Sequence, residues 1–309
     1  MSGPRVLVVA ATHGNECNAA WLLEGWRAQP HTLDSHGLEL ALEIGNPAAY
    51  AANCRYVERD LNRSFAPPLL VDPRRQELEV RRARELLAVY GATGPRPACV
   101  AIDLHSTTSA MGNSLVVYGR RPADLALAAG VQARLGLPIY LHEGDAAQTG
   151  FLVERWPSGL VIEVGPVPQG VIEARICRQT QLGLEAALAV IGAAGHGCLR
   201  LPRHLVVHRH RASLDLPRDA DGTPMACLDP RRQGCDWQPI QAGDGLFCRR
   251  DGRGTAYAPP ADLVEGPAWP VFINEAAYGE KGIALSLTSR EIWPVEAGWG
   301  EALTALLER

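Results

Sequence analysis

Two side chains that can bind a metal ion follow the first apolar run of the chain. His13 and Glu16 come after residues 6–10, which indicate a buried strand, and before residues 17–27, which have a helical pattern. In open α/β sheets, ligands bind at the carboxyl ends of the strands, just before the helices that follow them. An imidazole and a carboxylate at this position suit zinc. Helix capping explains these two residues equally well when they are considered alone.

Two later apolar runs also end on residues with useful chemistry. Residues 98–104 are followed by His105, and residues 160–162 are followed by Glu163. If these strands lie parallel to the first one, their carboxyl ends meet at one edge of the sheet. The imidazoles and carboxylates of all three strands would then lie together. This arrangement favours a metal site over a simple helix cap.

The composition excludes several classes of function. The chain has 309 residues, of which 47% are hydrophobic, and a formal net charge of −4, which fits an enzyme with one large and one smaller domain. The chain has no acidic or basic tail of the kind that would indicate binding to nucleic acid or to a membrane surface. No apolar run approaches the ~20 residues of a membrane span, and the run before His13 is too short for a signal peptide. The eight cysteines lack a Cys-x-x-Cys spacing, which predicts reduced thiols in a cytoplasmic protein.

Strand and helix patterns alternate up to residue 191. The predicted strands include 38–44, 115–118 and 139–141, and the predicted helices include 73–90, 125–135 and 171–191. This alternation predicts an α/β fold with a mostly parallel sheet that helices cover on both faces. After the small-residue linker 192–197, a period-two pattern and hairpin-type turns predict a smaller β-rich domain.

Some polar features allow two interpretations. The charged, irregular loop 53–65 has the length of a functional loop, although its composition alone favours a solvated surface crossing. His208 and His210 share a face of a predicted strand, either as a metal pair or, as we favour, as surface residues. Arg82 and Arg84 are interpreted as part of the solvated face of the helix predicted at 73–90.

Taken together, the motifs resemble those of the aspartoacylase family, a branch of the zinc-carboxypeptidase-like superfamily that includes aspartoacylase and aminoacylase 3. The matching segments are 12–16, 60–63, 103–108, 162–166 with 169–170, and 274–278. The resemblance therefore runs in order over nearly the whole chain. It implies a zinc-carboxypeptidase-like catalytic domain at residues 1–197 and a C-terminal β domain at residues 198–309 that covers the active-site entrance.

The resemblance also implies a metal site and a base. His13, Glu16 and His105 would bind one zinc ion per chain and leave the fourth position to water. Glu163 would take a proton from that water and later pass it to the leaving amine. Asp103 precedes His105 by two residues on the same side of the strand, where it would either orient the histidine or form a core salt bridge.

Further residues would bind the substrate. By the same resemblance, Arg55 would stabilise the oxyanion of the tetrahedral intermediate. Asn62 and Arg63 would hold the substrate carboxylate, Arg63 as a two-pronged clamp. Tyr278 would close over the site from the C-terminal domain. Asp60 allows the same two interpretations as Asp103, and neither is predicted to be catalytic.

Three functions are compatible with this set of motifs. The chain could be a zinc-dependent amidohydrolase of N-acyl amino acids, a metallocarboxypeptidase, or a non-catalytic protein stabilised by its metal. A domain that carries Tyr278 over the site favours a roofed pocket for a small molecule, and a structural metal needs no free carboxylate such as Glu163. We therefore predict a hydrolase of N-acyl-L-aspartate, with other N-acyl amino acids as the alternative substrates, and leave a homodimer open.

The segment before Glu163 departs from the family pattern. Aspartoacylase has an arginine there that pairs with the second carboxylate of its substrate, and this chain has none at the corresponding place. If Arg155 reaches the pocket, it can pair with that carboxylate. If Arg155 faces solvent, Phe151 and Leu152 would line an apolar pocket suited to aromatic or aliphatic N-acyl amino acids. The overall resemblance slightly favours aspartate.

Overall fold

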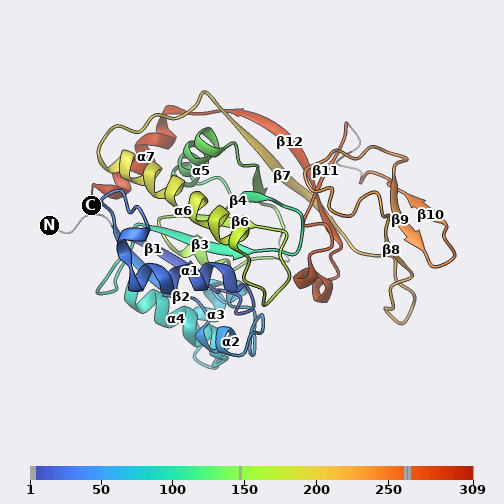
Figure 1. Cartoon of the computed structure of the whole chain (residues 1–309), viewed down its shortest axis with the longest axis horizontal. Coiled ribbons are helices and arrows are strands. Elements are labelled where there is room, and N and C mark those ends of the chain that lie inside the picture. The colour runs from blue at the N-terminus through green and yellow to red at the C-terminus, as the bar shows by residue number, and fades with distance from the viewer. Residues whose placement is uncertain (1–4, 146–147, 261–262, 264–265, 309) are drawn as a thin grey trace.

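The fold is organised around one large mixed sheet. The computed structural model describes residues 5–145, 148–260, 263 and 266–308, and its main sheet has nine strands in the order β11-β12-β7-β5-β4-β6-β3-β1-β2 (Figure 1). The strands are β1 (Arg5–Ala10), β2 (Glu39–Ile44), β3 (Val100–Ser106), β4 (Asn113–Tyr118), β5 (Ile139–His142), β6 (Ser158–Val164), β7 (His204–Leu214), β11 (Trp269–Val271) and β12 (Leu285–Pro294).

The pairing of these strands is mostly parallel, as predicted. Parallel pairs join β1 to β2, β1 to β3, β3 to β6, β4 to β5 and β5 to β7. Antiparallel pairs join β4 to β6, β7 to β12 and β11 to β12. The three strands that carry the sequence motifs, β1, β3 and β6, are therefore adjacent and parallel. Their carboxyl ends meet at one edge of the sheet, which confirms the α/β prediction.

Helices and turns cover both faces of the sheet (Figure 1). On one face, Val6 and Val8 of β1 pack into the core formed with α1 (Cys17–Ala28), α5 (Pro122–Leu135), α6 (Ala174–Gly195) and α7 (Ala297–Leu307). On the other face, Leu7 and Val9 pack into the core that contains α4 (Leu78–Tyr90). Because both faces are buried, the strand reads as a continuous apolar run instead of an alternating one.

The predicted helix at 73–90 begins later than expected. The short helices α2 (Pro47–Ala51) and α3 (Pro67–Val71) come first, and α4 starts at Leu78. The Asp72 carboxylate accepts a hydrogen bond from the Arg74 backbone N–H at 3.0 Å, which forms a turn rather than a helix cap. Proline after aspartate is common both in turns and at the start of helices, so the dipeptide alone did not distinguish a turn from a helix start.

The solvated interpretation of two arginines on α4 is wrong. Arg82 and Arg84 are half-buried, and their guanidinium groups donate hydrogen bonds to backbone carbonyls of neighbouring segments. The acceptors are Ile44 and Gly45 for Arg82, and Leu69, Leu70, Asp72 and Arg75 for Arg84. A helical pattern reports which residues avoid the core, but it does not report what lies beside the polar face.

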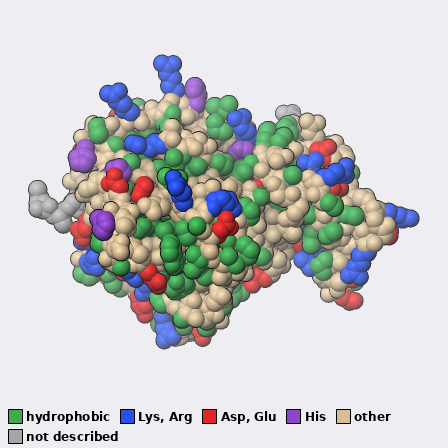
Figure 2. Space-filling model, in the orientation of Figure 1, with side chains coloured by type: hydrophobic (Ala, Val, Ile, Leu, Met, Phe, Trp, Pro, Cys, Tyr) green, Lys and Arg blue, Asp and Glu red, His purple; other side chains and the backbone are tan. Residues whose placement is uncertain are grey.

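The C-terminal part of the chain forms a protruding lobe (Figures 1 and 2). The long strands β7 and β12 lead from the main sheet into the lobe, where β8 (Ala226–Leu228), β9 (Gly245–Arg249) and β10 (Gly254–Ala256) form a second sheet around a small core. The last helix, α7, returns to pack against α5 and α6. The division of the chain at residue 197 stays a prediction, and the main sheet continues across it.

The two histidines of β7 are buried, so their interpretation as surface residues is wrong. The His208 ring meets the rings of Trp237 and Trp269 at centroid distances of 4.9 and 6.1 Å. The His210 Nδ1 atom lies 2.8 Å from the Tyr140 hydroxyl oxygen. The reason is tertiary, because β7 lies between β5 and β12 inside the sheet and is not an edge strand.

The cysteines and the helix lengths bear on two further sequence predictions. All eight cysteines are free thiols in the structure. In the part of the chain that the structure describes, no helix combines the length and the apolarity needed to cross a bilayer.

Candidate metal and substrate site

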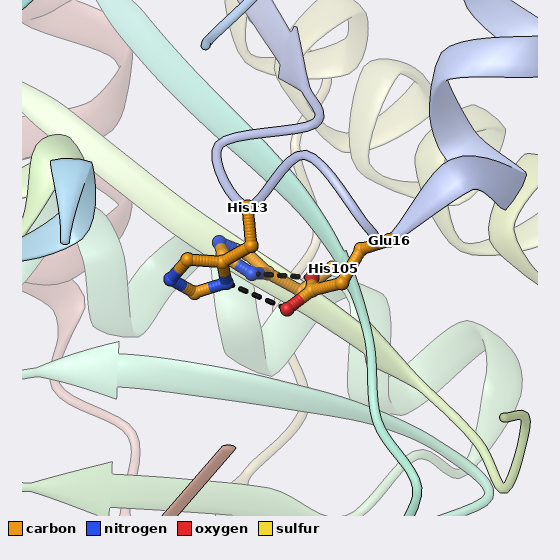
Figure 3. Close-up of side chains that lie close together, drawn as sticks. All are labelled: His13, Glu16 and His105. Atoms are coloured by element: carbon orange, nitrogen blue, oxygen red, sulfur yellow. Dashed lines mark hydrogen bonds and ion pairs between the residues drawn. The ribbon is translucent and has the colours of Figure 1, made fainter. Parts of the chain in front are cut away.

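His13, Glu16 and His105 converge where β1 and β3 end (Figure 3). One Glu16 oxygen lies 2.6 Å from His13 Nδ1, and the other lies 2.9 Å from His105 Nδ1. The potential ligand atoms of the three residues all lie within 4.8 Å of one another, and all three side chains are buried. The sharp turn between β1 and α1 creates this geometry, because it returns Glu16 toward the strand that carries His105.

Each histidine is held at its second ring nitrogen by an aspartate. His105 Nε2 lies 2.8 Å from Asp103 Oδ2, and His13 Nε2 lies 3.1 Å from Asp60 Oδ1. Such carboxylate partners orient the histidine ligands of zinc sites. Both Nδ1 atoms face the shared Glu16 carboxylate, so two imidazole nitrogens and a carboxylate form a donor set that fits zinc. Asp103 and Asp60 therefore each contact a histidine of the cluster, and Asp60 also pairs with Arg55 and Lys281.

The electrostatics of the cluster favour a cation. Burial opposes ionisation of Glu16, but the adjacent His13 and His105 lower its pKa below the ordinary glutamate value. Burial also opposes ionisation of Asp60, but His13 and then Arg55 hold its pKa well below its usual range. Burial lowers the pKa of His105, but Asp103 and Glu16 outweigh it and raise that pKa. The carboxylates of the cluster thus stay ionised, and their negative charge favours a cation beside them.

Glu163 lies next to the cluster on β6. It pairs in register with His105 of the neighbouring strand, and its side chain is buried. Burial raises the pKa of Glu163 well above its usual value, with Glu16 and Glu275 adding to the effect and His105 opposing it. A carboxyl group with a raised pKa can both accept and release a proton near neutral pH.

All the predicted site residues line one cavity. They are His13, Glu16, Arg55, Asn62, Arg63, His105, Glu163 and Tyr278. The structure therefore brings these residues together, while their individual roles stay predictions.

The loop at 53–65 carries Arg55 into the cavity and is held by a buried carboxylate. Glu79 of α4 is fully buried and accepts hydrogen bonds from the backbone N–H groups of Val57 and Arg59 at 2.7 and 3.0 Å. Arg55 then reaches Asp60 at 3.2 Å. The loop is therefore not a solvated crossing. Glu79 was missed in the sequence, because one glutamate in the first turn of a helix is an ordinary pattern.

Arg63 lines the same cavity as the metal-binding cluster. One of its nitrogens donates a hydrogen bond to the Asn62 carbonyl at 2.8 Å, and another donates to Gln148 Oε1 at 2.6 Å. The guanidinium carbon lies 4.3 Å from the centroid of the Phe151 ring. The Asn62 side-chain oxygen accepts a hydrogen bond from the Leu152 backbone at 2.9 Å. These contacts hold both residues before any ligand arrives.

One part of the cavity wall, called the aromatic end below, is formed by packed rings. Tyr118 and Phe151 stack with ring centroids 3.8 Å apart and an interplanar angle of 19°. Phe272 packs against Tyr140 at 5.5 Å and against Tyr278 at 5.3 Å. Of these rings, the sequence singled out only Tyr278 and Phe151. Tyr118 ends β4, which runs antiparallel to β6, so it lies away from the strand ends that carry the motifs, and no local signal in the sequence identified it.

Tyr278 enters the cavity because Glu275 anchors its segment. The Glu275 carboxylate accepts hydrogen bonds from the Thr108 backbone N–H at 2.8 Å and from the Thr107 hydroxyl. A few residues later, the ammonium of Lys281 lies 3.3 Å from Asp60. Glu275 and Lys281 thus hold the C-terminal segment against the catalytic part, although the sequence pattern assigned neither residue to the site.

Arg155 does not reach the cavity. It is exposed at the end of the short 3-10 turn at Leu152–Arg155, and it is absent from the cavity lining in the described residues. Phe151 lines the cavity as predicted, whereas Leu152 is buried behind it. Residues 146–147 of the same loop lie outside the described residues.

Comparison with known sequences matches both parts of the chain. The model of the succinylglutamate desuccinylase/aspartoacylase catalytic domain matches residues 2–191, and the AstE/AspA barrel-sandwich hybrid domain matches residues 203–290. A relative from Parasynechococcus marenigrum (strain WH8102), named "Probable aspartoacylase", is 59% identical over 98% of each chain. One from Synechococcus sp. (strain CC9605) with the same name is 57% identical over 99% of each chain.

Solved structures give the same result. Murine aminoacylase 3 aligns with a TM-score of 0.83 and 31% identity, over 96% of this chain and 98% of that one. A point mutant of the same murine enzyme aligns with a TM-score of 0.86 and 30% identity, over 96% and 97%. The succinylglutamate desuccinylase from Chromobacterium violaceum, at 17% identity and a TM-score of 0.59 over 95% and 85%, shares the fold.

Proposed function

Because the chain belongs to the succinylglutamate desuccinylase/aspartoacylase family and is an amidohydrolase of linear amides, we propose that it hydrolyses N-acyl amino acids with one zinc ion per chain. The ligands are His13, Glu16 and His105. The observation that carries the proposal is the orientation of the two histidines, whose Nδ1 atoms face Glu16 while aspartates hold Nε2. A carboxylate partner on each remote nitrogen supports a metal ligand rather than a helix cap.

Glu163 moves the proton in this proposal. When bound, zinc would lower the pKa of a water molecule toward about 7. Glu163 accepts the proton of the attacking water and later donates it to the leaving amine nitrogen. Burial raises the pKa of this carboxyl group, which supports its protonated form in the second half of the cycle.

Arg55 and Arg63 serve two different negative charges. Arg55 is held by Asp60 at 3.2 Å and by Glu16 at 3.5 Å, beside the metal-binding cluster, where the oxyanion develops. Arg63 and Asn62 line the same cavity farther along and bind the carboxylate of the amino acid. Tyr278 closes over the bound molecule and supports a small substrate rather than a peptide.

N-acyl-L-aspartate is the first candidate substrate, because the relatives at 59% and 57% identity carry the name "Probable aspartoacylase". A specific observation favours a second candidate, an N-acyl aromatic amino acid. Phe151 lines the cavity and Arg155 faces solvent, so the segment supplies no arginine for a second carboxylate. Aromatic rings cover much of the cavity wall instead.

One set of assays tests these proposals. We expect hydrolysis of N-acetylaspartate or N-acetylphenylalanine, its loss with a chelator and its return with zinc, and no cleavage of a dipeptide. The ratio of kcat/KM for the two N-acetyl compounds decides between the candidates. Arg155→Ala should leave both values unchanged, because its side chain lies outside the cavity. Full activity in metal-free enzyme, or preference for the dipeptide, would contradict the proposal. Cytoplasmic location and dimerisation stay predictions.

A further inference from the structure

One polar atom in the aromatic end of the cavity lacks a partner. His142, the last residue of β5, lines the cavity and is only 7% exposed. Among the described residues, its Nε2 atom forms no hydrogen bond. Buried polar atoms are nearly always paired, and leaving one unpaired costs about 1–3 kcal/mol. A ligand in the cavity can supply the missing partner.

The other nitrogen of His142 belongs to a small network. The Tyr140 hydroxyl oxygen lies 3.3 Å from His142 Nδ1 and 2.8 Å from His210 Nδ1. Burial raises the pKa of Tyr140, so the hydroxyl keeps its proton. With one proton, it donates to one histidine and accepts from the other. His142 therefore uses Nδ1 within the protein, and its Nε2 remains for the cavity.

His142 is also neutral at physiological pH. Burial, and then the neighbouring His210, lower its pKa to about 4. Asp145 and the Gln148 backbone act in the opposite direction and are outweighed. A ligand group would therefore meet a neutral imidazole, which can form a hydrogen bond but cannot form an ion pair.

The ring cannot easily turn away from the cavity. It packs edge-on against Phe151 at 5.3 Å and against Tyr118 at 5.8 Å, with interplanar angles of 78° and 77°. Tyr118 and His142 pair in register on β4 and β5, so both side chains project from the same face of the sheet. This neighbourhood orients the free nitrogen in advance of binding.

We propose that His142 determines specificity by forming a hydrogen bond, through Nε2, with a polar group at the end of the substrate's amino-acid side chain. This inference rests on the proposed hydrolysis of N-acyl amino acids and deepens it. The group is a carboxylate or a hydroxyl, and a purely hydrocarbon side chain leaves the nitrogen unpaired. Sites built around such a hydrogen bond discriminate strongly against analogues that lack the group.

The test compares substrates that differ in this group. The pairs are N-acetyltyrosine with N-acetylphenylalanine, and N-acetylaspartate with N-acetylleucine. In His142→Phe, we expect kcat/KM for the polar member of the preferred pair to fall about 10–100-fold relative to the apolar member. The reason is that the variant loses one hydrogen bond in a buried site. His142→Gln retains a donor and an acceptor and should recover part of the ratio.

A matched control separates recognition from folding. His208 is a second buried histidine on the same sheet, but it lies outside the cavity lining. We expect His208→Gln to leave the substrate ratio unchanged. Equal loss for both members of each pair in His142→Phe and His142→Gln, or an unchanged ratio in both, would overturn the role of His142. Failure of the wild-type enzyme to hydrolyse any of the four compounds would instead overturn the proposed function.

Discussion

The two ends of the cavity are built in opposite ways. At the metal-binding end, charged groups are paired, with Glu16 between two histidines and aspartates behind them. At the aromatic end, rings stack around Tyr118 and Phe151, and the one histidine that lines it is neutral. The metal-binding end is stabilised by paired charges, whereas the aromatic end, in the described residues, has packed rings and one unpaired imidazole nitrogen.

This difference separates the reaction from the choice of substrate. In the proposed function, groups at the metal-binding end act on the amide bond, which all N-acyl amino acids share. Groups at the aromatic end would meet the side chain, which differs between these substrates. Substitutions at the metal-binding end should therefore lower the rate of hydrolysis of every substrate by a similar factor. Substitutions at the aromatic end should change which substrate is hydrolysed fastest.

The largest effect is expected at the ligands. His105→Ala removes one of three ligands and should abolish both bound zinc and hydrolysis of every substrate. Metal analysis of the purified protein together with activity assays checks this. His31→Ala, at an exposed histidine, is the control and should retain both. A full complement of zinc in His105→Ala would show that the assignment of the ligand is wrong.

Glu163→Gln should separate metal binding from catalysis. Glutamine retains the shape but cannot accept the proton, so kcat should fall by about 10²–10⁴ while the zinc content stays the same. The fall should be equal for aspartate and aromatic substrates, because the proton transfer is common to both. A change confined to KM would mean that Glu163 only binds the substrate.

Arg55→Ala should have a slightly smaller effect. The loss of one group that stabilises an oxyanion lowers kcat by about 10²–10³. Arg55→Lys keeps the charge but not the two-pronged geometry, and should recover only part of the rate. Steady-state kinetics with both candidate substrates measures this. A rate loss seen with one substrate only would mean that Arg55 contributes to substrate selection and not to the chemical step that both substrates share.

Asp103→Asn tests the support behind a ligand. The carboxylate holds His105 Nε2 at 2.8 Å and is fully buried. Loss of such a partner weakens metal affinity by about 10–100-fold. Competition with a chromophoric chelator measures the affinity, with Asp34→Asn at an exposed site as the control. Unchanged metal affinity would show that Asp103 contributes only to the structure of the core and does not support the metal ligand.

The smallest effect concerns stability and pH. Burial, and then the charge of Arg290, lower the pKa of His208 to about 4, against 6.5 in the unfolded chain. The unfolded state binds more protons between these values, so stability falls as pH decreases from about 6.5 toward 4. This cost reaches about 2 kcal/mol at pH 5 and is absent at pH 7.5. His208→Gln should lose part of this pH dependence in denaturant unfolding, whereas His31→Gln should not.

The sequence alone determined the parts of the site that follow from local pattern. The apolar runs before His13, His105 and Glu163 identified three strands, and their parallel pairing places these residues at one edge of the sheet. The order of the motifs along the chain identified the family. These features can be recognised in the sequence because a strand buried on both faces needs a continuous apolar run, and because the residue that ends the strand marks the edge of the sheet.

Tertiary structure alone decided what lies behind and opposite these residues. Asp60 and Asp103 became partners of the ligands, Glu79 became the anchor of the Arg55 loop, and His142 became part of the cavity wall. Each of these contacts joins a side chain to an element whose position in space is not encoded by local periodicity. Hydrophobic pattern specifies which face of an element is covered, whereas a hydrogen bond across the fold depends on which element covers it.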